Sequence, residues 1–471
     1  MGRTKIICTL GPASEDEKII AGLVSSGMDV ARINFSHGTH DEICSLILKV
    51  RKVSSETGNP IAILGDIAGP KIRIGELENE SITIRAGEEL TITTREVIGT
   101  AGLVSTTYPD LMSDVDKGNR ILIDDGRIEL VVTEVRPEEV RTQVVIGGEL
   151  KSHKGMNLPG VTVSAPAISA KDFKDIGFAV REGFDILALS FVRKPDDVTR
   201  AKKLIANCNS DIPIIAKIEK EEAVNSFDAI LHEADGIMIA RGDLGVEMAS
   251  EQVPLIQKRI IKACNKAGKP VITATQMLES MISDPRPTRA ETSDVANAVI
   301  DGSDAVMLSG ETAVGNYPIN AVETMQRIID SVEKELGQGR SMVDWIPPEE
   351  IKVEDAVTAA ACRAAELLNA KAIVAYTQSG STAMRLSKYR PRTRIFAITP
   401  SEVIRRRLAI YWGVCSVLVE EVLDTESMVS KAEKIALKSG FAKSRDIIVI
   451  TSGTPIGVSG TTNLVNVHRI P

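Results

Sequence analysis

The chain has 471 residues, and its 56 lysines and arginines against 64 aspartates and glutamates give a formal net charge of −8. Hydrophobic residues make up 43% and charged residues 25% of the sequence, which is ordinary globular usage and argues against a largely disordered chain. The acidic balance gives no general attraction for nucleic acid or an anionic membrane, so we expect neither as a partner. At roughly 150 residues per domain, the length indicates about three domains.

The six cysteines are scattered, without a C-x-x-C pair or a histidine at zinc spacing. This pattern favours a reducing compartment in which the thiols are packing residues. No apolar run of the sequence reaches the roughly 18 residues of a membrane span, and the first apolar stretch is too short for a signal peptide. We therefore expect a soluble, cytoplasmic protein.

Eight short β-branched runs follow one another, each ending in a polar or glycine-rich cluster. They cover residues 5–12, 30–38, 61–70, 186–194, 212–220, 236–245, 270–278 and 305–313. Apolar strands that alternate with amphipathic stretches are typical of a parallel sheet covered by helices. Eight such units predict an α/β fold of the (β/α)₈ barrel type, with its chemistry at the carboxyl ends of the strands. A doubly wound open sheet is the alternative, but the glycine-rich dinucleotide turn after the first strand is missing.

The third and fourth strands are about 115 residues apart, far too long for an ordinary crossover. The intervening stretch, 71–167, alternates apolar and polar residues with a period of two and contains AG, DDG and GG turns. It predicts a small antiparallel β-barrel domain placed on the catalytic end of the barrel as a lid, which would exclude water when closed.

After the eighth unit, residues 337–355 are rich in glycine, proline and charge and predict a linker. Strands and helices then alternate, which predicts a third domain of the α/β type. We expect a discontinuous catalytic barrel (1–70 and 168–340), a lid (71–167) and a regulatory domain (341–471).

Six polar clusters fall at strand ends, namely RINFSH, GDIAGPK, KIE, RGD, ATQ and SGET. Six such clusters at equivalent barrel positions favour one shared active site over six separate surface turns. Glu219 and Asp243 end adjacent strands, and two carboxylates with positions left for substrate and water suit Mg²⁺ or Mn²⁺. Lys217 lies two residues before Glu219 and so on the same inward face, where an unpaired lysine is costly and a phosphate or enolate would explain it.

At this point the motifs resemble the pyruvate kinase family, and the resemblance covers the whole chain. The matching runs are TLGPAS, RINFSHG, KIE, GIMIARGDLGVE, ITATQMLESMI, RPTRAETSDVANAVIDGSDAVMLSGETAVGNYP and TQSGSTA. The family transfers the phosphoryl group of phosphoenolpyruvate to ADP with Mg²⁺, giving pyruvate and ATP in the last step of glycolysis. Its barrel, β-rich lid and C-terminal α/β domain agree with the order of elements expected here.

The resemblance implies roles for the strand-end residues. Glu219 and Asp243 hold the metal, Lys217 and Arg32 meet the phosphoryl group, Gly242 and Asp243 hold the substrate carboxylate, and Thr275 lies on the side where C3 is protonated. Because a hydroxyl of normal pKa is a poor acid, we expect Thr275 to orient a water or relay rather than to donate directly. Ser309 and Glu311 are expected to lie next to these residues and to hold them in position without contacting the substrate.

The resemblance also implies ligand sites outside the phosphoenolpyruvate centre. The nucleotide is expected between barrel and lid, at Pro12, Asn34, His37, Arg73 and Lys154. The family's monovalent-cation site corresponds to Asn34, Ser36, Asp66 and Ile67. A phosphorylated effector is expected at the loop formed by Thr377, Ser379, Gly380, Ser381 and Thr382, for which a plain strand-to-helix turn is the alternative. The family is usually a homotetramer, and we expect the same here.

One departure from the family concerns the monovalent cation. K⁺-dependent members commonly contain D-T-K-G-P-E, whereas this chain contains D-I-A-G-P-K from Asp66 to Lys71. The acid that accompanies the cation is thus replaced by Lys71, whose tethered ammonium could substitute for K⁺. A second enzyme class stays open at this point, namely Mg²⁺-dependent aldolases or mutases that act on pyruvate or phosphoenolpyruvate, which lack the β-rich lid.

Overall fold

The structure, a computed structural model, describes residues 2–339, 352–422, 424–455 and 461–471. Eight parallel strands close into a barrel in the order β1, β2, β3, β12, β13, β14, β15, β16. Their bounds are Lys5–Thr9, Met28–Asn34, Ala62–Ile67, Ile186–Leu189, Ile214–Ile218, Gly236–Ala240, Val271–Ala274 and Ala305–Leu308. Each strand overlaps its expected stretch, which confirms the predicted (β/α)₈ barrel.

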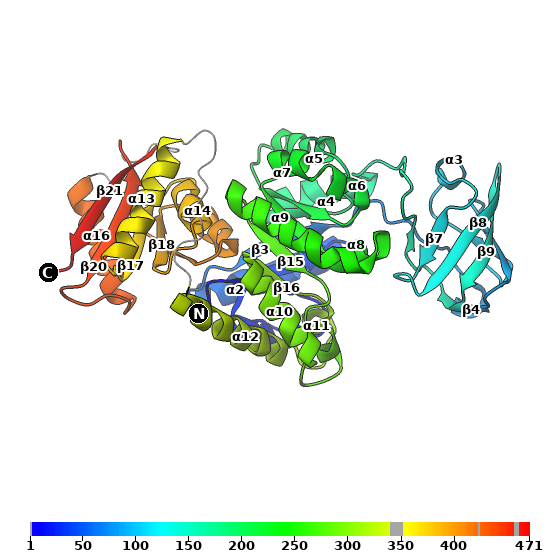
Figure 1. Ribbon diagram of the computed structural model, residues 1–471, viewed down its shortest axis with the longest axis horizontal. Helices are drawn as coiled ribbons and strands as arrows, with labels where there is room; N and C mark the ends of the chain where they lie inside the picture. Colours follow the sequence, from blue (N-terminus) through cyan, green and yellow to red (C-terminus); the bar gives the residue numbers. More distant parts are fainter. Residues whose placement is uncertain (1, 340–351, 423, 456–460) are drawn as a thin grey trace.

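Helices surround the barrel on its outside (Figure 1). They are α1 Glu17–Ser26, α2 His40–Thr57, α4 Ala170–Arg181, α5 Pro195–Asn207, α6 Glu221–Asn225, α7 Phe227–Glu233, α8 Arg241–Glu247, α9 Val253–Ala267, α10 Arg289–Asp301, α11 Gly310–Ala313 and α12 Pro318–Gly339. Capping boxes fix where several begin: the Thr288 side chain accepts from the Glu291 N–H, and the Glu291 side chain accepts from the Thr288 N–H. Barrel strands are buried on both faces, which explains their continuous rather than alternating apolar runs.

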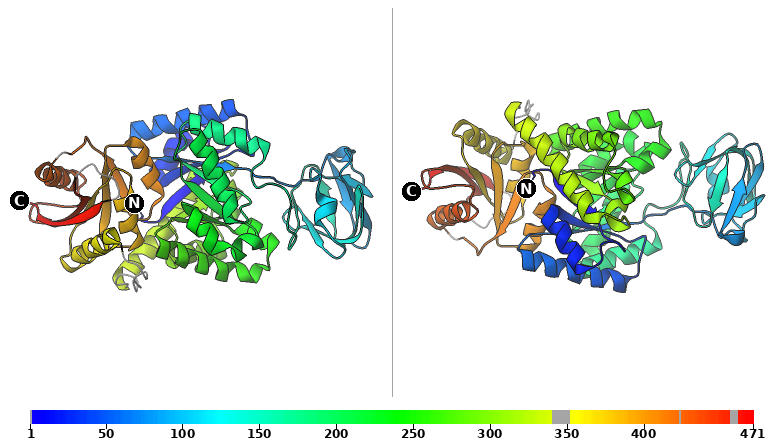
Figure 2. Two further views of the ribbon diagram at one scale, coloured as in Figure 1. Left: turned by 90° about the horizontal axis from the view of Figure 1, so that it is seen from above. Right: turned by 90° about the horizontal axis from the view of Figure 1, so that it is seen from below.

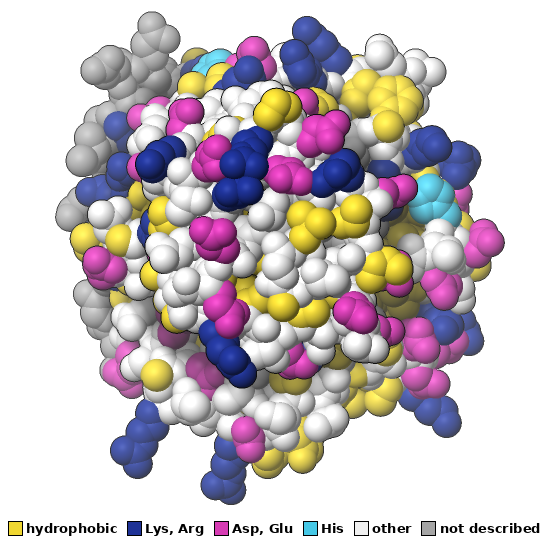
Figure 3. All heavy atoms as spheres, turned by 90° about the vertical axis from the view of Figure 1, so that its right-hand side faces the viewer, with side chains coloured by type: hydrophobic (Ala, Val, Ile, Leu, Met, Phe, Trp, Pro, Cys, Tyr) yellow, Lys and Arg dark blue, Asp and Glu magenta, His cyan; other side chains and the backbone are white. Residues whose placement is uncertain are grey.

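The inserted segment forms a separate β-rich body beyond the carboxyl ends of the barrel strands (Figures 1 and 2). Its strands are β4 Ser81–Ile84, β5 Glu89–Thr93, β6 Leu103–Ser105, β7 Arg120–Ile123, β8 Ile128–Arg136, β9 Glu139–Ile146, β10 Gly148–Lys151 and β11 Met156–Asn157, with a short α3 at Leu111–Asp114. The expected period of two is visible in β9, where Val140, Thr142 and Val144 are buried and Gln143 is exposed. The surface at this end of the molecule carries interspersed basic and acidic side chains (Figure 3).

The lid differs from the expected antiparallel β-barrel in two details. Its strands form a six-stranded sheet and a two-stranded sheet rather than one closed barrel. One pair, β5 and β6, is parallel. The connection from Thr93 to Leu103 is therefore a crossover rather than a hairpin, and period-two alternation alone does not distinguish the two.

The C-terminal domain is a five-stranded sheet in the order β19, β18, β17, β20, β21, in which only the last pair is antiparallel. Its elements are α13 Val353–Leu367, β17 Ala372–Tyr376, α14 Ser381–Lys388, β18 Arg394–Thr399, α15 Glu402–Arg407, η4 Leu408–Ile410, β19 Val414–Leu418, α16 Thr425–Lys438, β20 Ile447–Gly453 and β21 Thr462–Arg469. The boundary expected at residue 340 and most of the expected linker lie outside the described residues. None of the described helices has both the length and the apolar character needed to cross a membrane.

The C-terminal domain and the lid lie at opposite ends of the barrel (Figures 1 and 2). Ala409 and Ile410 of η4 belong to the same apolar cluster as the inward-facing strand residues Ile7 and Val30. Ion pairs surround this contact at the amino-terminal ends of the strands: Arg406 Nε lies 2.8 Å from Asp185, and Arg390 lies 3.0 Å from Asp304. The domain thus closes the end of the barrel opposite to the predicted active site.

Candidate active site

Charged side chains gather at the carboxyl ends of the barrel strands, as predicted. Arg32 comes from β2, Asp66 from β3 and Lys217 from β13, while Glu219 directly follows β13. Asp243 lies in the first turn of α8 after β14, and Thr275 directly follows β15. The barrel therefore brings together side chains that are far apart in the sequence.

The buried carboxylate of Asp66 joins two cations. Its Oδ2 lies 2.6 Å from Arg32 Nη2, and its Oδ1 lies 3.2 Å from Lys217 Nζ. Ser190 donates to the same Oδ1 at 3.2 Å. Burial alone would raise the pKa of Asp66, but the charges of Lys217 and Arg32 outweigh burial and hold that pKa below its ordinary value.

Lys217 is held between two carboxylates. Its Nζ lies 2.8 Å from Glu219 Oε1 and donates to Ser190 Oγ at 2.8 Å, in addition to its contact with Asp66. Burial opposes the charged form, but Asp66 and Glu219 outweigh it and raise the pKa of Lys217. The premise that this lysine is unpaired was therefore wrong: the protein itself fixes the ammonium in place.

Glu219 and Asp243 form the expected pair of acids. Glu219 Oε2 accepts a hydrogen bond from the Phe191 N–H at 2.9 Å. Burial, followed by the neighbouring charge of Glu219, raises the pKa of Asp243 to about 6. Two mutually repelling carboxylates in a partly desolvated position fit a divalent cation, which would relieve that repulsion. Among the described residues, no group of three or more histidine, cysteine or acidic side chains forms a fuller metal cage.

Thr275 is in direct contact with Gly242. The Gly242 N–H donates to Thr275 Oγ1 at 2.7 Å, and that hydroxyl donates to the Ala274 carbonyl at 2.7 Å. The Gly242 N–H, which we expected to be free for a substrate carboxylate, is thus bonded to a hydroxyl here. Thr275 and Gln276 have φ values of 66° and 54°, a left-handed conformation that is costly for a β-branched residue and typical of functional sites.

Arg241 is a positioning residue to which the sequence reasoning gave no role. Its guanidinium donates to the carbonyls of Ala274 (3.3 Å) and Thr275 (2.8 Å) and pairs with Asp294 of α10 at 2.7 Å. It therefore holds the strained turn after β15 against α8. The sequence feature that could have indicated this role is the position of Arg241, directly after a buried apolar strand and directly before Gly242 and Asp243.

Ser309 and Glu311 support the same turn from the last strand. Glu311 accepts hydrogen bonds from the Ser309 N–H (2.7 Å) and the Leu278 N–H (3.0 Å). Burial raises the pKa of the Glu311 carboxyl above its ordinary value. These bonds connect the ends of β15 and β16, in keeping with the expected supporting position.

The residues expected to meet a nucleotide fall into two groups. Asn34 ends β2, and Pro12 and His37 lie in the loops after β1 and β2; Asn34 Oδ1 accepts from the Ser36 N–H at 3.0 Å. Arg73 and Lys154 lie close together in the two chain segments that enter and leave the lid, because Arg73 forms an isolated β-bridge with Gly155 and donates to the His153 carbonyl at 2.9 Å. No hydrogen bond or ion pair joins the two groups in the described part of the chain.

Lys71 lies at the base of the lid, close to the acidic pair. A Cβ built on Gly155 would come within 3.1 Å of Lys71 Cε, so the lysine stem lies against the returning strand. The charge of Lys71 lowers the pKa of Asp243, which opposes the effects of burial and Glu219. Lys71 and Asp243 also line one pocket together with Asp125, Arg193 and Lys220. Two of the positions expected around a monovalent cation are already engaged within the protein. The Asp66 carboxylate forms ion pairs with Arg32 and Lys217, and the Ile67 side chain is buried.

Comparison with known proteins identifies the family. The family model for the barrel domain of pyruvate kinase matches residues 1–322, and the model for its alpha/beta domain matches residues 355–468. The chain belongs to the pyruvate kinase family. The pyruvate kinase of Geobacillus stearothermophilus is 48% identical over 471 residues, which cover 99% of this chain and 80% of that relative. A pyruvate kinase of Staphylococcus epidermidis is 46% identical over 472 residues, which cover 100% of this chain and 81% of the relative.

The solved structures agree with this assignment. The crystal structure of a pyruvate kinase from Cryptosporidium parvum superposes with a TM-score of 0.93 at 38% identity, covering 100% of this chain and 96% of that chain. The family is one of phosphotransferases, and the alternative of an aldolase or mutase is not supported by these comparisons.

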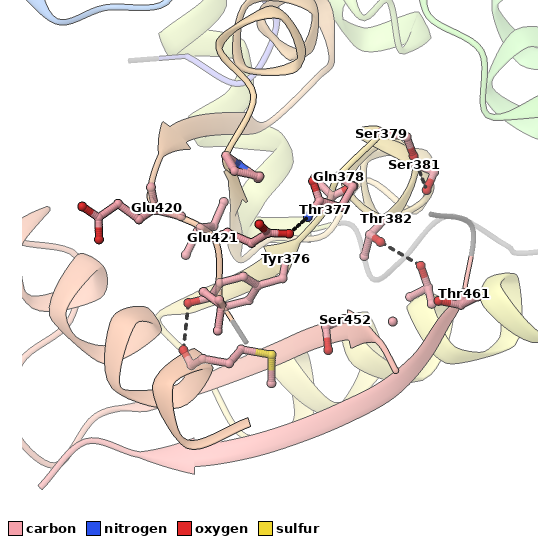
Figure 4. A pocket seen from close by; sticks show the side chains of 17 residues that line it. Tyr376, Thr377, Gln378, Ser379, Ser381, Thr382, Glu420, Glu421, Ser452 and Thr461 are labelled. Carbon is pink, nitrogen blue, oxygen red and sulfur yellow. Dashed lines mark hydrogen bonds between the residues drawn. The ribbon is translucent and has the colours of Figure 1, made fainter. Parts of the chain in front are cut away.

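The loop expected to bind a phosphorylated effector borders a small pocket between β17 and α14 (Figure 4). Thr377 Oγ1 accepts from the Gly380 N–H at 2.9 Å, and Thr382 shares a hydrogen bond with Thr462 at 2.7 Å. Glu420 and Glu421 also line the pocket, whereas its described lining includes no lysine or arginine. A phosphate here would depend on hydroxyl groups, backbone N–H groups and the Gln378 amide, without a cationic side chain among the described lining residues.

Proposed function

We propose that this chain transfers the phosphoryl group of phosphoenolpyruvate to ADP, giving pyruvate and ATP. The observation that supports this proposal best is the buried ammonium of Lys217, held between Asp66 and Glu219 beside the Arg32 guanidinium. Phosphoryl transfer needs positive charge already in position, since the charge lies on the phosphoryl oxygens throughout the reaction. A lysine fixed by its neighbours requires no rearrangement when the substrate arrives.

Each of these residues is assigned to one part of phosphoenolpyruvate. Arg32 and Lys217 bind the phosphoryl group, and Lys217 stays with the enolate oxygen after transfer. The first turn of α8, with Gly242 and Asp243, lies at the substrate carboxylate. Thr275 positions the water or relay that protonates C3, because a hydroxyl of ordinary pKa is a poor proton donor itself.

Glu219 and Asp243 would hold Mg²⁺ or Mn²⁺. The ion supplies positive charge toward the substrate oxygens when it is bound. K⁺ is not required in this proposal, because Lys71 already brings a tethered cation to the neighbourhood of Asp243.

ADP enters between barrel and lid, where Pro12, Asn34 and His37 face Arg73 and Lys154 across the cleft when the lid closes. Closure excludes water from the transferring group. The C-terminal domain has a regulatory role and binds a phosphorylated small molecule. The protein is a cytoplasmic homotetramer. Membership of the family supports these assignments, and no contact described above bears on them.

A pyruvate-release assay on Lys217→Met tests the proposal. Removing one preorganised charge is expected to lower the turnover number by about a hundredfold or more. Lys203→Met, which removes an exposed lysine from the outer helix α5, serves as the matched control and is expected to keep parental activity. Because Lys217→Met leaves two buried carboxylates with less compensation, circular dichroism must show a folded variant. Equal rates for a folded Lys217→Met and the parent would refute the mechanism.

A further inference from the structure

Two buried carboxylates lie on α4, the helix that leads from the lid back into the barrel. They belong to Asp172 and Asp175. Neither is part of the acid pair formed by Glu219 and Asp243, and neither touches Lys217. Charged side chains in a protein interior are costly unless hydrogen bonds or ion pairs compensate them, so the partners of these two carboxylates indicate what they do.

Asp172 connects α4 to the start of the lid. Its Oδ2 accepts from the Ser169 N–H at 2.7 Å, which completes a capping box at the beginning of the helix. Its Oδ1 accepts from the Gly69 N–H at 3.1 Å, two residues before Lys71. Gly69 has a φ of 68°, and a Cβ at this position would come within 2.7 Å of the Phe191 ring, which favours glycine. The segment that enters the lid is therefore held by the helix that follows the lid.

Asp175 joins two side chains that come from different helices. Its Oδ1 lies 2.8 Å from Nε2 of His40 on α2, and its Oδ2 lies 2.7 Å from Nζ of Lys171, one turn earlier on α4. The His40 ring stacks on Phe178 with 4.0 Å between the ring centroids, which fixes the orientation of the imidazole. Both oxygens of the carboxylate thus have partners that are themselves held in place.

Lys171 connects this cluster to the loop after β2. Its Nζ donates to the Phe35 carbonyl at 2.7 Å, although the side chain is 59% exposed. The Phe35 N–H donates to the Asp66 carbonyl at 3.0 Å. The backbone of Phe35 is therefore bonded to β3 through its N–H and to α4 through its carbonyl. Its two neighbours in the chain are Asn34 and Ser36, which are expected to meet the nucleotide and the monovalent cation.

We propose that Lys171, Asp175 and His40 are positioning residues for the nucleotide, which hold the loop of residues 34–38 in the conformation that receives ADP. This inference rests on the proposed function, because it assigns these side chains to the nucleotide part of the same site. No hydrogen bond within the described ranges joins the barrel residues expected around the nucleotide directly to those of the lid. Helix α4 supplies the connection, since Lys171 holds the loop after β2 and Asp172 holds the entrance of the lid.

Steady-state kinetics of the full chain, with ADP and phosphoenolpyruvate varied in turn, test the inference. Lys171→Met is expected to raise the KM for ADP by about tenfold, because the loop loses a hydrogen bond from a charged donor. The turnover number and the KM for phosphoenolpyruvate are expected to stay within about twofold of the parental values, since Asp66 holds both cations that face that substrate. Lys171→Arg keeps a cationic donor and is expected to recover most of the affinity for ADP.

Asp175→Asn removes the charge between His40 and Lys171 and is expected to raise the KM for ADP by a similar factor. Because Asp175 is buried, this variant is less certain to fold, and the exposed Lys171 carries the test, with circular dichroism as the check of folding. Lys174→Met removes another exposed lysine of α4 and is the matched control, with parental kinetics expected.

The possible failures are distinguishable. An active parent with an unchanged KM for ADP in a folded Lys171→Met would overturn the inference and leave the proposed function intact. An equal loss of affinity for both substrates, or the same loss in Lys174→Met, would also overturn it, because the effect would then be a general one on the helix. A parent that turns over no ADP would overturn the proposed function and this inference with it.

Discussion

At the scale of single residues, the barrel mouth contains a nearly balanced set of charges. Arg32 and Lys217 are offset by Asp66 and Glu219, and Asp243 adds a further carboxylate whose pKa is raised to about 6. The set is thus close to neutral around Arg32 and Lys217 and negative near Asp243. Lys71 adds one more positive charge near Asp243. The requirement for a monovalent cation is therefore the property in which we expect this chain to differ from K⁺-dependent members of the family.

Lys71→Glu restores the acid that K⁺-dependent members carry at this position. The parent is expected to keep its turnover in buffer free of potassium and sodium, because the lysine supplies the charge. The variant is expected to lose at least tenfold in that buffer and to regain activity when K⁺ is added. Lys151→Glu, with the same charge change at an exposed site of the lid, controls for the altered net charge. Collapse of the parent without K⁺ would show that Lys71 does not replace the ion.

Thr275→Val keeps the shape of the side chain but removes the hydroxyl that accepts from the Gly242 N–H. We expect the turnover number to fall by about a hundredfold, typical for loss of a group that positions proton transfer, while the KM for phosphoenolpyruvate changes less. Thr275→Ser retains the hydroxyl and is expected to recover most of the activity. Unchanged turnover in a folded Thr275→Val would remove this residue from the mechanism.

At the scale of elements, the lid is attached to the helix that carries part of the active site. Asn157 of β11 donates to Glu247 Oε1 of α8 at 2.9 Å, and Lys220 pairs with the same carboxylate. From the return segment of the lid, the Ala165 carbonyl accepts from Arg193 at 2.7 Å. Since Gly242 and Asp243 lie in the first turn of α8, the lid contacts the same short helix that carries these two candidate site residues.

Asn157→Ala removes the amide that joins lid and helix. One hydrogen bond contributes roughly 1 kcal/mol, so we expect the KM for ADP to rise by about fivefold. The melting temperature is expected to stay within about 2 °C of the parental value, because the lid keeps its own core. Gln143→Ala, an exposed amide of β9, is the matched control. A parental KM for ADP in Asn157→Ala would mean that this contact has no part in closure.

At the scale of the whole molecule, the C-terminal domain is fastened to the barrel by arginines. Asp185 is buried, accepts from the Ile63 N–H at 2.8 Å and pairs with both Arg51 and Arg406 at 2.8 Å. The η4 residues fill the end of the barrel between these pairs. The C-terminal domain is therefore held on the barrel by an apolar contact and by ion pairs between the two domains.

Arg406→Met removes one of the ion pairs that cross this boundary and leaves Asp185 with Arg51 as its only cation. We expect the free energy of unfolding to fall by about 1–3 kcal/mol, because a buried carboxylate loses one of its two cations. Urea titration followed by circular dichroism measures the change, and Arg363→Met is the exposed control. Identical midpoints for Arg406→Met and the parent would show that the pair between Arg406 and Asp185 does not help to fasten the domain.

The sequence predicts the elements better than the contacts between them. The eight barrel strands could be recognised because each is a continuous apolar run, and the lid because β9 alternates. The bond between Asp66 and Lys217 spans 151 residues, and nothing local to either position indicates it. The parallel pairing of β5 with β6 could not be predicted either. The alternation of apolar and polar residues indicates which face of a strand is buried, but not which strand lies beside it or in which direction that strand runs.

The insertion of the lid also orders events during synthesis. The barrel closes only when β1 pairs with β16, so β1, β2 and β3 wait while about 240 further residues are made. At bacterial or eukaryotic elongation speeds this wait lasts roughly 10 to 50 s. The lid is complete long before that time and has a core of its own. We expect it to be the first part of the chain to reach its final form on the ribosome. Beside it, the apolar strands β1, β2 and β3 can pair with one another but still lack their outer partners β16 and β12, and chaperones would cover them.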